Sequence, residues 1–379
     1  MNRRTMIRSA LTGTAGLFGA LGGAAWLFLR ELKFGANPAD GRLERVRRSP
    51  NFRDGGFQNQ LPTEIMTKVH RSKSVWNLPW SRSRRARPAG PLPSLKCDLL
   101  HMPRDGNFMV WFGHSSYFIQ IDGKRLIVDP VLSGTASPIP FTTRAFAGTD
   151  PYTVTDLPDV DYLFISHDHW DHLDYDTVKK LRSKVQSVVC GLGVGAHLER
   201  WGYGKERITE GDWGDSVDLG GGFTTYIRTA RHFSGRDLHR NQTLWVSFAL
   251  RTSSGYKIFL GGDGGYGPHF KQIGAEFDGF DLAVLENGQY NEAWRSIHMM
   301  PEQTLQAADD LRATHFIPVH NSKFCISNHD WDAPLRTITS IAGTRRSRIL
   351  TPVIGQIVAL QAPEAASAEW WKAPGVGEI

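Results

Sequence analysis

Short apolar runs, each closed by a turn signal, recur along the chain between residues 108 and 319. Such runs predict buried or half-buried strands, and Asp122-Gly123 between two of them predicts a hairpin turn. The predicted strands are Phe108–Trp111, Tyr117–Ile121, Arg125–Val128, Leu163–Ser166, Val188–Gly191, Thr224–Ile227, Thr243–Leu250, Lys257–Leu260, Leu282–Leu285 and Phe316–Val319.

Helical patterns fall between these strands, at Asp176–Arg182, Val194–Trp201 and Pro301–Ala313. The last of them has a proline in its first turn, where proline is well tolerated. Many strands with helices interspersed predict two packed sheets covered by helices. We therefore expect one main domain over residues 99–362.

The N-terminal residues carry a different pattern. Ala10 to Leu29 are 20 consecutive positions without a charged side chain, which is just enough for a helix to span a bilayer. Upstream, Asn2 to Arg8 resembles a twin-arginine export signal. We expect residues 1–30 to be an export signal or a membrane anchor. The protein is then anchored or exported, with the periplasmic side favoured over the cytoplasmic face.

Residues 31–98 form a lead-in rich in proline and arginine, which predicts an extended segment. A strap over the domain and a poorly ordered linker both fit this pattern. Much of the surplus of positive charge (net +6) lies before residue 90, which suits an anionic membrane surface at least as well as nucleic acid. Residues 363–379 are predicted to be a tail, whose Trp370-Trp371 packs on the body or enters a membrane interface.

The three cysteines form no metal motif and no disulfide framework, and each is predicted to be a small core residue. They are Cys97, Cys190 and Cys325.

The strongest chemical signal is the loop from His167 to His172, which follows an apolar run directly. It holds three imidazoles and two carboxylates within six residues, and these are ligands that zinc and similar ions prefer. His167 and His169 are two apart on extended backbone and can share one ion. Asp171 and His172 follow where the chain turns into a helix, so they can hold a second ion.

Three more candidate ligands follow predicted strands: His232, Asp263 and His320. We expect His167, His169 and His232 to bind one zinc ion, and Asp171, His172 and His320 the other. Asp263 is expected to bridge the two ions with its two oxygens. Seven ligands match what two adjacent zinc ions require while leaving room for a shared hydroxide. Iron and manganese also suit such a set.

This ligand set resembles that of the metallo-β-lactamase superfamily, and longer motifs resemble its N-acyl-phosphatidylethanolamine phospholipase D branch. The resemblance covers about residues 50 to 340 and implies an α/β fold, a four-layer αββα sandwich with two mixed β-sheets and a two-zinc site at one edge. The motifs are Ser49–Arg53, Trp111–Ser116, Val128–Ser133, Gly261–Tyr266, Phe280–Ala283, His298–Gln303 and His320–Phe324.

The resemblance implies a zinc-dependent hydrolase that uses a hydroxide between the metals. The favoured substrate is an N-acyl-phosphatidylethanolamine-like phospholipid, cleaved as a phosphodiester, with a membrane surface as the partner. Two alternatives remain: a lactone or amide hydrolase with a soluble substrate, and a non-catalytic envelope protein stabilised by zinc. No RNA-clamping domain is recognisable between Asp263 and His320, so we expect no nucleic acid partner. A homodimer is left open.

Other residues receive weaker predictions. With Asp263, His298 is the predicted catalytic residue, because the resemblance places it at the cleft edge as a proton donor or phosphate contact; a structural hydrogen bond fits it equally. For His114 a structural hydrogen bond is favoured over catalysis. Asp129 is expected to support the metal loop, and Asp168 either accepts a bond from a ligand histidine or shapes the loop. Tyr290 and Lys323 could contact an anionic head group, but an ordinary surface or rim role is expected for each.

Overall fold

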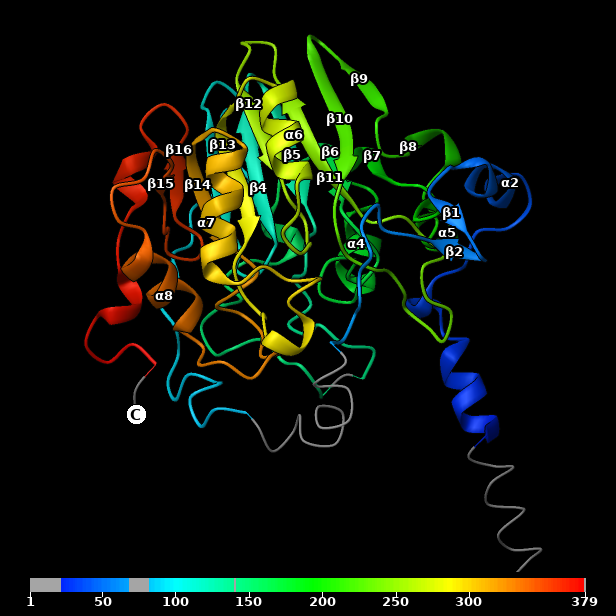
Figure 1. The fold of residues 1–379 in the computed structure, drawn as a ribbon, viewed down its shortest axis with the longest axis horizontal. Helices are drawn as coiled ribbons and strands as arrows, with labels where there is room; N and C mark the ends of the chain where they lie inside the picture. Colours follow the sequence, from blue (N-terminus) through cyan, green and yellow to red (C-terminus); the bar gives the residue numbers. More distant parts are fainter. Residues whose placement is uncertain (1–21, 68–81, 140, 378–379) are drawn as a thin grey trace, which may run out of the picture.

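The computed structural model describes residues 22–67, 82–139 and 141–377 (Figure 1). Two seven-stranded sheets form the body of this part of the chain. The first sheet is antiparallel at one end and parallel at the other, so it is mixed. In spatial order its strands are β16 (Ile357–Ala359), β3 (Phe108–Trp111), β4 (Tyr117–Ile121), β5 (Lys124–Val128), β6 (Val160–Ile165), β7 (Val185–Gly191) and β8 (Ile208–Gly211).

The second sheet is also mixed, with parallel pairs at the end that holds the late strands. Its strands, in spatial order, are β15 (Arg348–Ile349), β14 (Ala313–Val319), β13 (Phe280–Glu286), β12 (Lys257–Leu260), β11 (Val246–Arg251), β10 (Phe223–Thr229) and β9 (Ser216–Gly220).

The two sheets pack face to face through one apolar core, in which the Phe164 ring of β6 lies 5.1 Å from the Phe248 ring of β11. Helices cover the two outer faces, so the layers follow the order helix, sheet, sheet, helix. The predicted αββα sandwich is confirmed. The helices are α4 (Tyr175–Leu181) and α5 (Gly195–Arg200) on the first sheet, and α6 (His269–Glu276), α7 (Pro301–Asp310) and α8 (Ala333–Ile341) on the second.

Every predicted strand is present, but many boundaries differ: β6, β7 and β14, for example, each begin three residues before the predicted start. Two further differences have a visible cause. The strand expected from Thr243 begins at Val246, because Leu244 N–H donates to the Leu192 carbonyl instead of joining the ladder. The helix expected to reach Ala313 ends at Asp310, since Arg312 takes a left-handed backbone (φ 53°) and Ala313 already starts β14. Hydrophobic patterning did not predict β8, β9, β15, β16, α6 or α8.

The lead-in is more ordered than an extended segment or a loose linker. It contains helix α2 (Asp40–Arg48) and a small hairpin of β1 (Phe52–Arg53) and β2 (Gly56–Phe57). Arg42 of α2 forms ion pairs with Glu199 and Glu210 of the body, at 2.8 and 2.9 Å. The described part of the lead-in does not include three of its aromatic and proline residues, Trp76, Pro79 and Trp80. The lead-in therefore packs on the sandwich where the structure describes it.

The C-terminal residues also pack on the body. Trp370 and Trp371 are buried, and the Trp370 ring lies 6.3 Å from the Trp331 ring. Of the two placements expected for this pair, packing on the domain is the one observed.

At the other end of the chain, residues 22–29 are helical, and the expected export motif at Asn2–Arg8 lies outside the described residues. Within residues 22–67, 82–139 and 141–377, no helix is long and apolar enough to cross a bilayer.

Candidate metal centre

The site lies along one edge of the sandwich, where several strands end. The metal loop, residues 167–172, follows β6, and His114 follows β3. In the second sheet, candidate residues follow β10, β12 and β14. Strands β10, β12 and β14 run in the same direction, because β11 is antiparallel to both β10 and β12. Their carboxyl ends therefore meet at the same edge, as in other open α/β sheets.

Three imidazoles form the first cluster. The Nδ1 of His169 lies 2.9 Å from the Nε2 of His167 and 3.2 Å from the Nε2 of His232. Ligand nitrogens about 2.0–2.1 Å from a tetrahedral zinc ion are roughly 3.3 Å apart. The His232 Nδ1 donates to the Ile297 carbonyl at 3.0 Å, which leaves its Nε2 lone pair facing the other two rings. The cluster has the geometry of one metal site.

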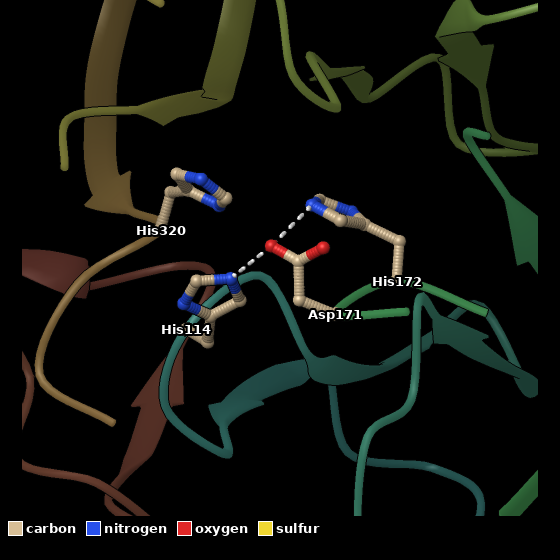
Figure 2. A group of neighbouring side chains, drawn as sticks. All are labelled: His114, Asp171, His172 and His320. Carbon is tan, nitrogen blue, oxygen red and sulfur yellow. Dashed lines mark hydrogen bonds and ion pairs between the residues drawn. The ribbon is translucent and has the colours of Figure 1, made fainter. Parts of the chain in front are cut away.

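The second cluster holds Asp171, His172, His320 and also His114 (Figure 2). One oxygen of Asp171 lies 2.9 Å from the Nε2 of His114 and 3.7 Å from the Nε2 of His172. The bond to Asp171 is the structural hydrogen bond favoured for His114, although its partner is itself a candidate ligand.

Asp263 lies between the two clusters. Its Oδ2 is 3.2 Å from the His172 Nε2 and about 4 Å from the His167 and His232 Nε2 atoms. Its Oδ1 is 3.2 Å from the His320 Nδ1. The structure thus brings all seven predicted ligands together, with this carboxylate in a position to contact both metal sites.

The residues present fit a divalent transition metal. The His172 Nε2 and the Asp263 Oδ1 are buried and have no hydrogen-bond partner among the described residues. Such orphaned atoms are costly unless an ion satisfies them. Burial, together with neighbouring imidazoles, holds the pKa values of His167 and His232 well below the ordinary range, so both rings are neutral and can bind a cation. The group could hold a metal ion, with nitrogen and oxygen donors only.

Outer residues hold the candidate ligands in place. The carboxylate of Asp129 accepts hydrogen bonds from the His172 Nδ1 at 2.8 Å and from the Ser166 N–H at 2.8 Å. This leaves the His172 Nε2 facing the cluster. Asp129, His114 and His320 all take left-handed backbones, with φ of 41°, 53° and 66°. For residues with a side chain this conformation costs roughly 1–2 kcal/mol each.

Asp168 shapes the loop, which is one of its two expected roles. Its carboxylate accepts hydrogen bonds from His197, Gly235 and Thr243, at 3.2, 2.7 and 2.9 Å. None of these three donors is a candidate ligand.

A buried carboxylate that the sequence did not point to, Glu286, ends β13 beside His298. Its Oε2 lies 2.6 Å from the His298 Nδ1, and that nitrogen is 4.0 Å from the Asp263 Oδ2. Burial raises the pKa of Glu286 to about 7, although His298 opposes the shift. Burial alone would lower the pKa of His298, but attraction to Glu286 outweighs it and raises it to about 9. His298 is therefore a charged donor held next to the candidate ligands.

Two predicted surface roles are wrong. Lys323 is fully buried, and its Nζ pairs with Asp150 at 2.9 Å and donates to the Phe112 carbonyl at 3.1 Å. Tyr290 is buried against the His329 ring, 4.8 Å away. Cys190 and Cys325 are buried and Cys97 is half-buried, and all three are free thiols.

Two cavities reach the candidate ligands. One of about 450 Å³ is lined by residues 53–65 of the lead-in and extends to His232. Another of about 370 Å³ reaches His169 and Asp171, and Arg240 and Ile326 lie at its wall. The Phe233 side chain borders both cavities.

An αββα sandwich with a cluster of histidines and aspartates at one edge defines the class of metal-dependent hydrolases of the metallo-β-lactamase fold. Residues 124–321 match the model of the beta-lactamase superfamily domain. The chain belongs to the beta-lactamase superfamily, and it is a metal-dependent hydrolase.

The chain is 37% identical to an uncharacterized protein of Mycobacterium tuberculosis, over 97% of this chain and all of that one. It is 30% identical to N-acyl-phosphatidylethanolamine-hydrolyzing phospholipase D 1 of Caenorhabditis elegans, over 68% of this chain and 75% of the relative. Among solved structures, a metallo hydrolase from the archaeon Ignicoccus hospitalis has the same fold. It superposes with a TM-score of 0.52 at 19% identity, over 66% of this chain and 97% of that one.

Proposed function

We propose that this hydrolase is a zinc-dependent phosphodiesterase of the phospholipase D type, acting on phospholipids with an N-acylated amine head group. The observation that carries the proposal is the convergence of six nitrogen- and oxygen-bearing side chains around the seventh, Asp263. The likeness to the nematode phospholipase D supports the choice of substrate. The donor set suits zinc, and two ions match the two clusters.

Two zinc ions, when bound, lower the pKa of a water between them and so supply hydroxide near neutral pH. In the proposed reaction, the water oxygen forms a bond to phosphorus and the bond from phosphorus to the head-group oxygen breaks. The leaving oxygen takes up a proton and departs as an N-acylated amino alcohol, while phosphatidic acid remains. No serine or cysteine nucleophile is required.

His298 is the proposed proton donor. Its Nδ1 is held by Glu286 at 2.6 Å, so the other ring nitrogen, Nε2, is free to donate to the leaving oxygen. The His298 side chain is 13% exposed, so it is not sealed off from solvent. Asp263 holds the two clusters at a fixed separation.

A lipid surface is the proposed source of the substrate. Exposed apolar side chains flank the cavity that reaches His169 and Asp171: Leu238 is 80% exposed and Ile326 36%. Phe141 lies in the sequence between Ala136 and Thr143, which line the same cavity, and it is 73% exposed. Arg240 at the wall adds a positive charge for anionic head groups. This face suits adsorption to a membrane, and we propose an anchored protein with its body on the periplasmic side.

The test is incubation of the metal-loaded protein with N-acyl-phosphatidylethanolamine vesicles and, separately, with a panel of lactones, following products by mass spectrometry. The proposal expects phosphatidic acid and N-acylethanolamine, both abolished by Asp263→Asn. Asp237→Asn is the control, since this carboxylate lines the cavity that reaches His169 and Asp171 but is not a candidate ligand. Lactone opening without lipid cleavage would replace the proposal with the soluble-substrate alternative.

A further inference from the structure

The segment of residues 32–37, which we call the strap, lies against the metal loop. A two-residue turn, Arg30-Glu31, separates it from the helical residues 22–29. Phe34 of the strap is 7% exposed, and its ring meets the Trp170 ring edge-on at 5.1 Å. Trp170 stands in the metal loop between His169 and Asp171, which belong to different clusters. The strap therefore touches the loop between two candidate ligands.

A buried guanidinium joins the strap to both ends of the loop. One amino group of Arg236 donates to the carbonyls of Asp168 and Leu173, at 2.9 and 2.6 Å. Its other amino group donates to the Lys33 carbonyl in the strap, at 2.9 Å. The guanidinium also stacks on the Trp170 ring at 3.8 Å. Since Arg236 is only 5% exposed, these contacts take place away from competing water.

A histidine makes the second connection. The Nδ1 of His197 accepts a hydrogen bond from the Ala36 N–H of the strap, at 3.1 Å. The ring proton must then be on Nε2, which lies 3.2 Å from the carboxylate of Asp168 in the loop. His197 thus passes a hydrogen bond from the strap backbone to the loop. The His197 side chain is buried, so water does not compete for these hydrogen bonds.

We propose that the strap is a positioning element of the metal centre, acting through Phe34, Arg236 and His197 on the loop that carries four of the seven ligands. Metal ligands must be held within about 0.5 Å of their productive positions, and outer partners of ligands typically contribute 10–100-fold to metal affinity. The strap lies outside the 124–321 match, whereas the loop, Arg236 and His197 lie inside it. The inference rests on the metal site and not on the lipid substrate.

The test measures metal affinity in the full chain, kept in detergent and stripped of metal. Zinc binding is followed by competition with a chromophoric chelator, without any substrate. The variants are Phe34→Ala, which removes the contact with Trp170, and His197→Gln, which keeps a donor toward Asp168 but moves its acceptor to Oε1, away from the Nδ1 position that receives the Ala36 N–H. Leu32→Ala is the matched control, because this strap side chain is 51% exposed.

We expect the zinc dissociation constant to rise 10–100-fold in Phe34→Ala and in His197→Gln, and to stay within twofold in Leu32→Ala. The melting temperature of the metal-free protein is measured alongside. A lower melting temperature with an unchanged dissociation constant in both variants would mean that the strap only stabilises the fold, and the proposal would be overturned. If Phe34→Ala does not fold, the outcome for His197→Gln decides alone.

Discussion

The Nδ1 of His298, a half-buried side chain, lies 2.6 Å from a carboxylate oxygen of the buried Glu286 at the edge of the metal centre. The histidine was a candidate from the sequence, but the carboxylate was not. Because the two charges face each other with little water, each strongly affects the protonation of the other. The pair gives the first prediction.

Replacing Glu286 by glutamine is expected to lower kcat by roughly 10–100-fold, because a positioned proton donor contributes about 10²–10⁴-fold. Glu286 raises the pKa of His298 to about 9, so its loss lowers that pKa. The alkaline limb of the rate profile then moves to lower pH, which a pH series of kcat/KM measures. Glu292→Gln, an exposed carboxylate in the next 3-10 helix, is the control. An unmoved alkaline limb in Glu286→Gln would contradict the role given to the pair.

Removing metal is expected to destabilise the fold. A ligand present at 100 times its dissociation constant stabilises a protein by about 2.7 kcal/mol. Calorimetry with zinc and after chelation should show the melting temperature falling on removal and returning on re-addition. In Asp263→Asn the two melting temperatures should nearly coincide, since the carboxylate facing both clusters is lost. An undiminished zinc shift in that variant would show that Asp263 is not a ligand.

The buried His269 should make the stability of the fold depend on pH, independently of any metal. Burial lowers its pKa to about 4, from 6.5 for the unfolded chain. As the pH falls below 6.5, the unfolded chain takes up a proton that the folded protein does not, so stability falls until about pH 4. Between pH 7.5 and 5.0 this group alone costs about 2 kcal/mol. Urea unfolding at both pH values measures the stability that is lost between pH 7.5 and 5.0. This loss should be smaller by about 2 kcal/mol in His269→Phe than in the unsubstituted protein, and the same as in that protein in the exposed control His239→Phe.

Lys323→Met is expected to lower the free energy of unfolding by about 1–3 kcal/mol, because it leaves the Phe112 carbonyl without its donor and Asp150 without its partner. The matched control is Lys96→Met. Lys96 pairs with Asp156 at a similar distance, 2.8 Å, but is 51% exposed, so its loss should cost less than about 1 kcal/mol. Equal effects in urea titrations would contradict the importance given to burial.

The metal loop and the central strands could be predicted from sequence because their signals are local. The loop holds its ligands within six residues, and the core strands are continuous apolar runs. Strand β16 escaped prediction because it is only three residues long and pairs with β3, whose residues lie about 250 positions earlier. Glu286 also escaped prediction because its partner is not a close neighbour in the sequence: His298 is 12 residues away. Long-range pairing leaves no periodicity in the chain.

Helix α2 and Lys323 show a second limit. The lead-in is rich in proline and arginine, which led us to predict an extended segment. In the structure, the charge of Arg42 in α2 is neutralised by Glu199 and Glu210, from a distant part of the chain. The prediction for Lys323 followed the general rule that lysine side chains stay exposed. Lys323 departs from this rule because Asp150 and the Phe112 carbonyl bind its charged Nζ inside the protein. Charge counts alone do not reveal which charges find partners.

His114, Asp129 and His320 share the left-handed backbone that glycine adopts without strain. Glycine at any of these positions should relax the backbone by about 1 kcal/mol and, at the same time, remove an imidazole or a carboxylate from the metal centre. The relieved strain does not make such a variant more stable, because the lost side chain also makes buried hydrogen bonds or helps to hold the metal that stabilises the fold. A glycine at position 129, for example, should lower the free energy of unfolding, since it leaves the His172 Nδ1 and the Ser166 N–H without their acceptor.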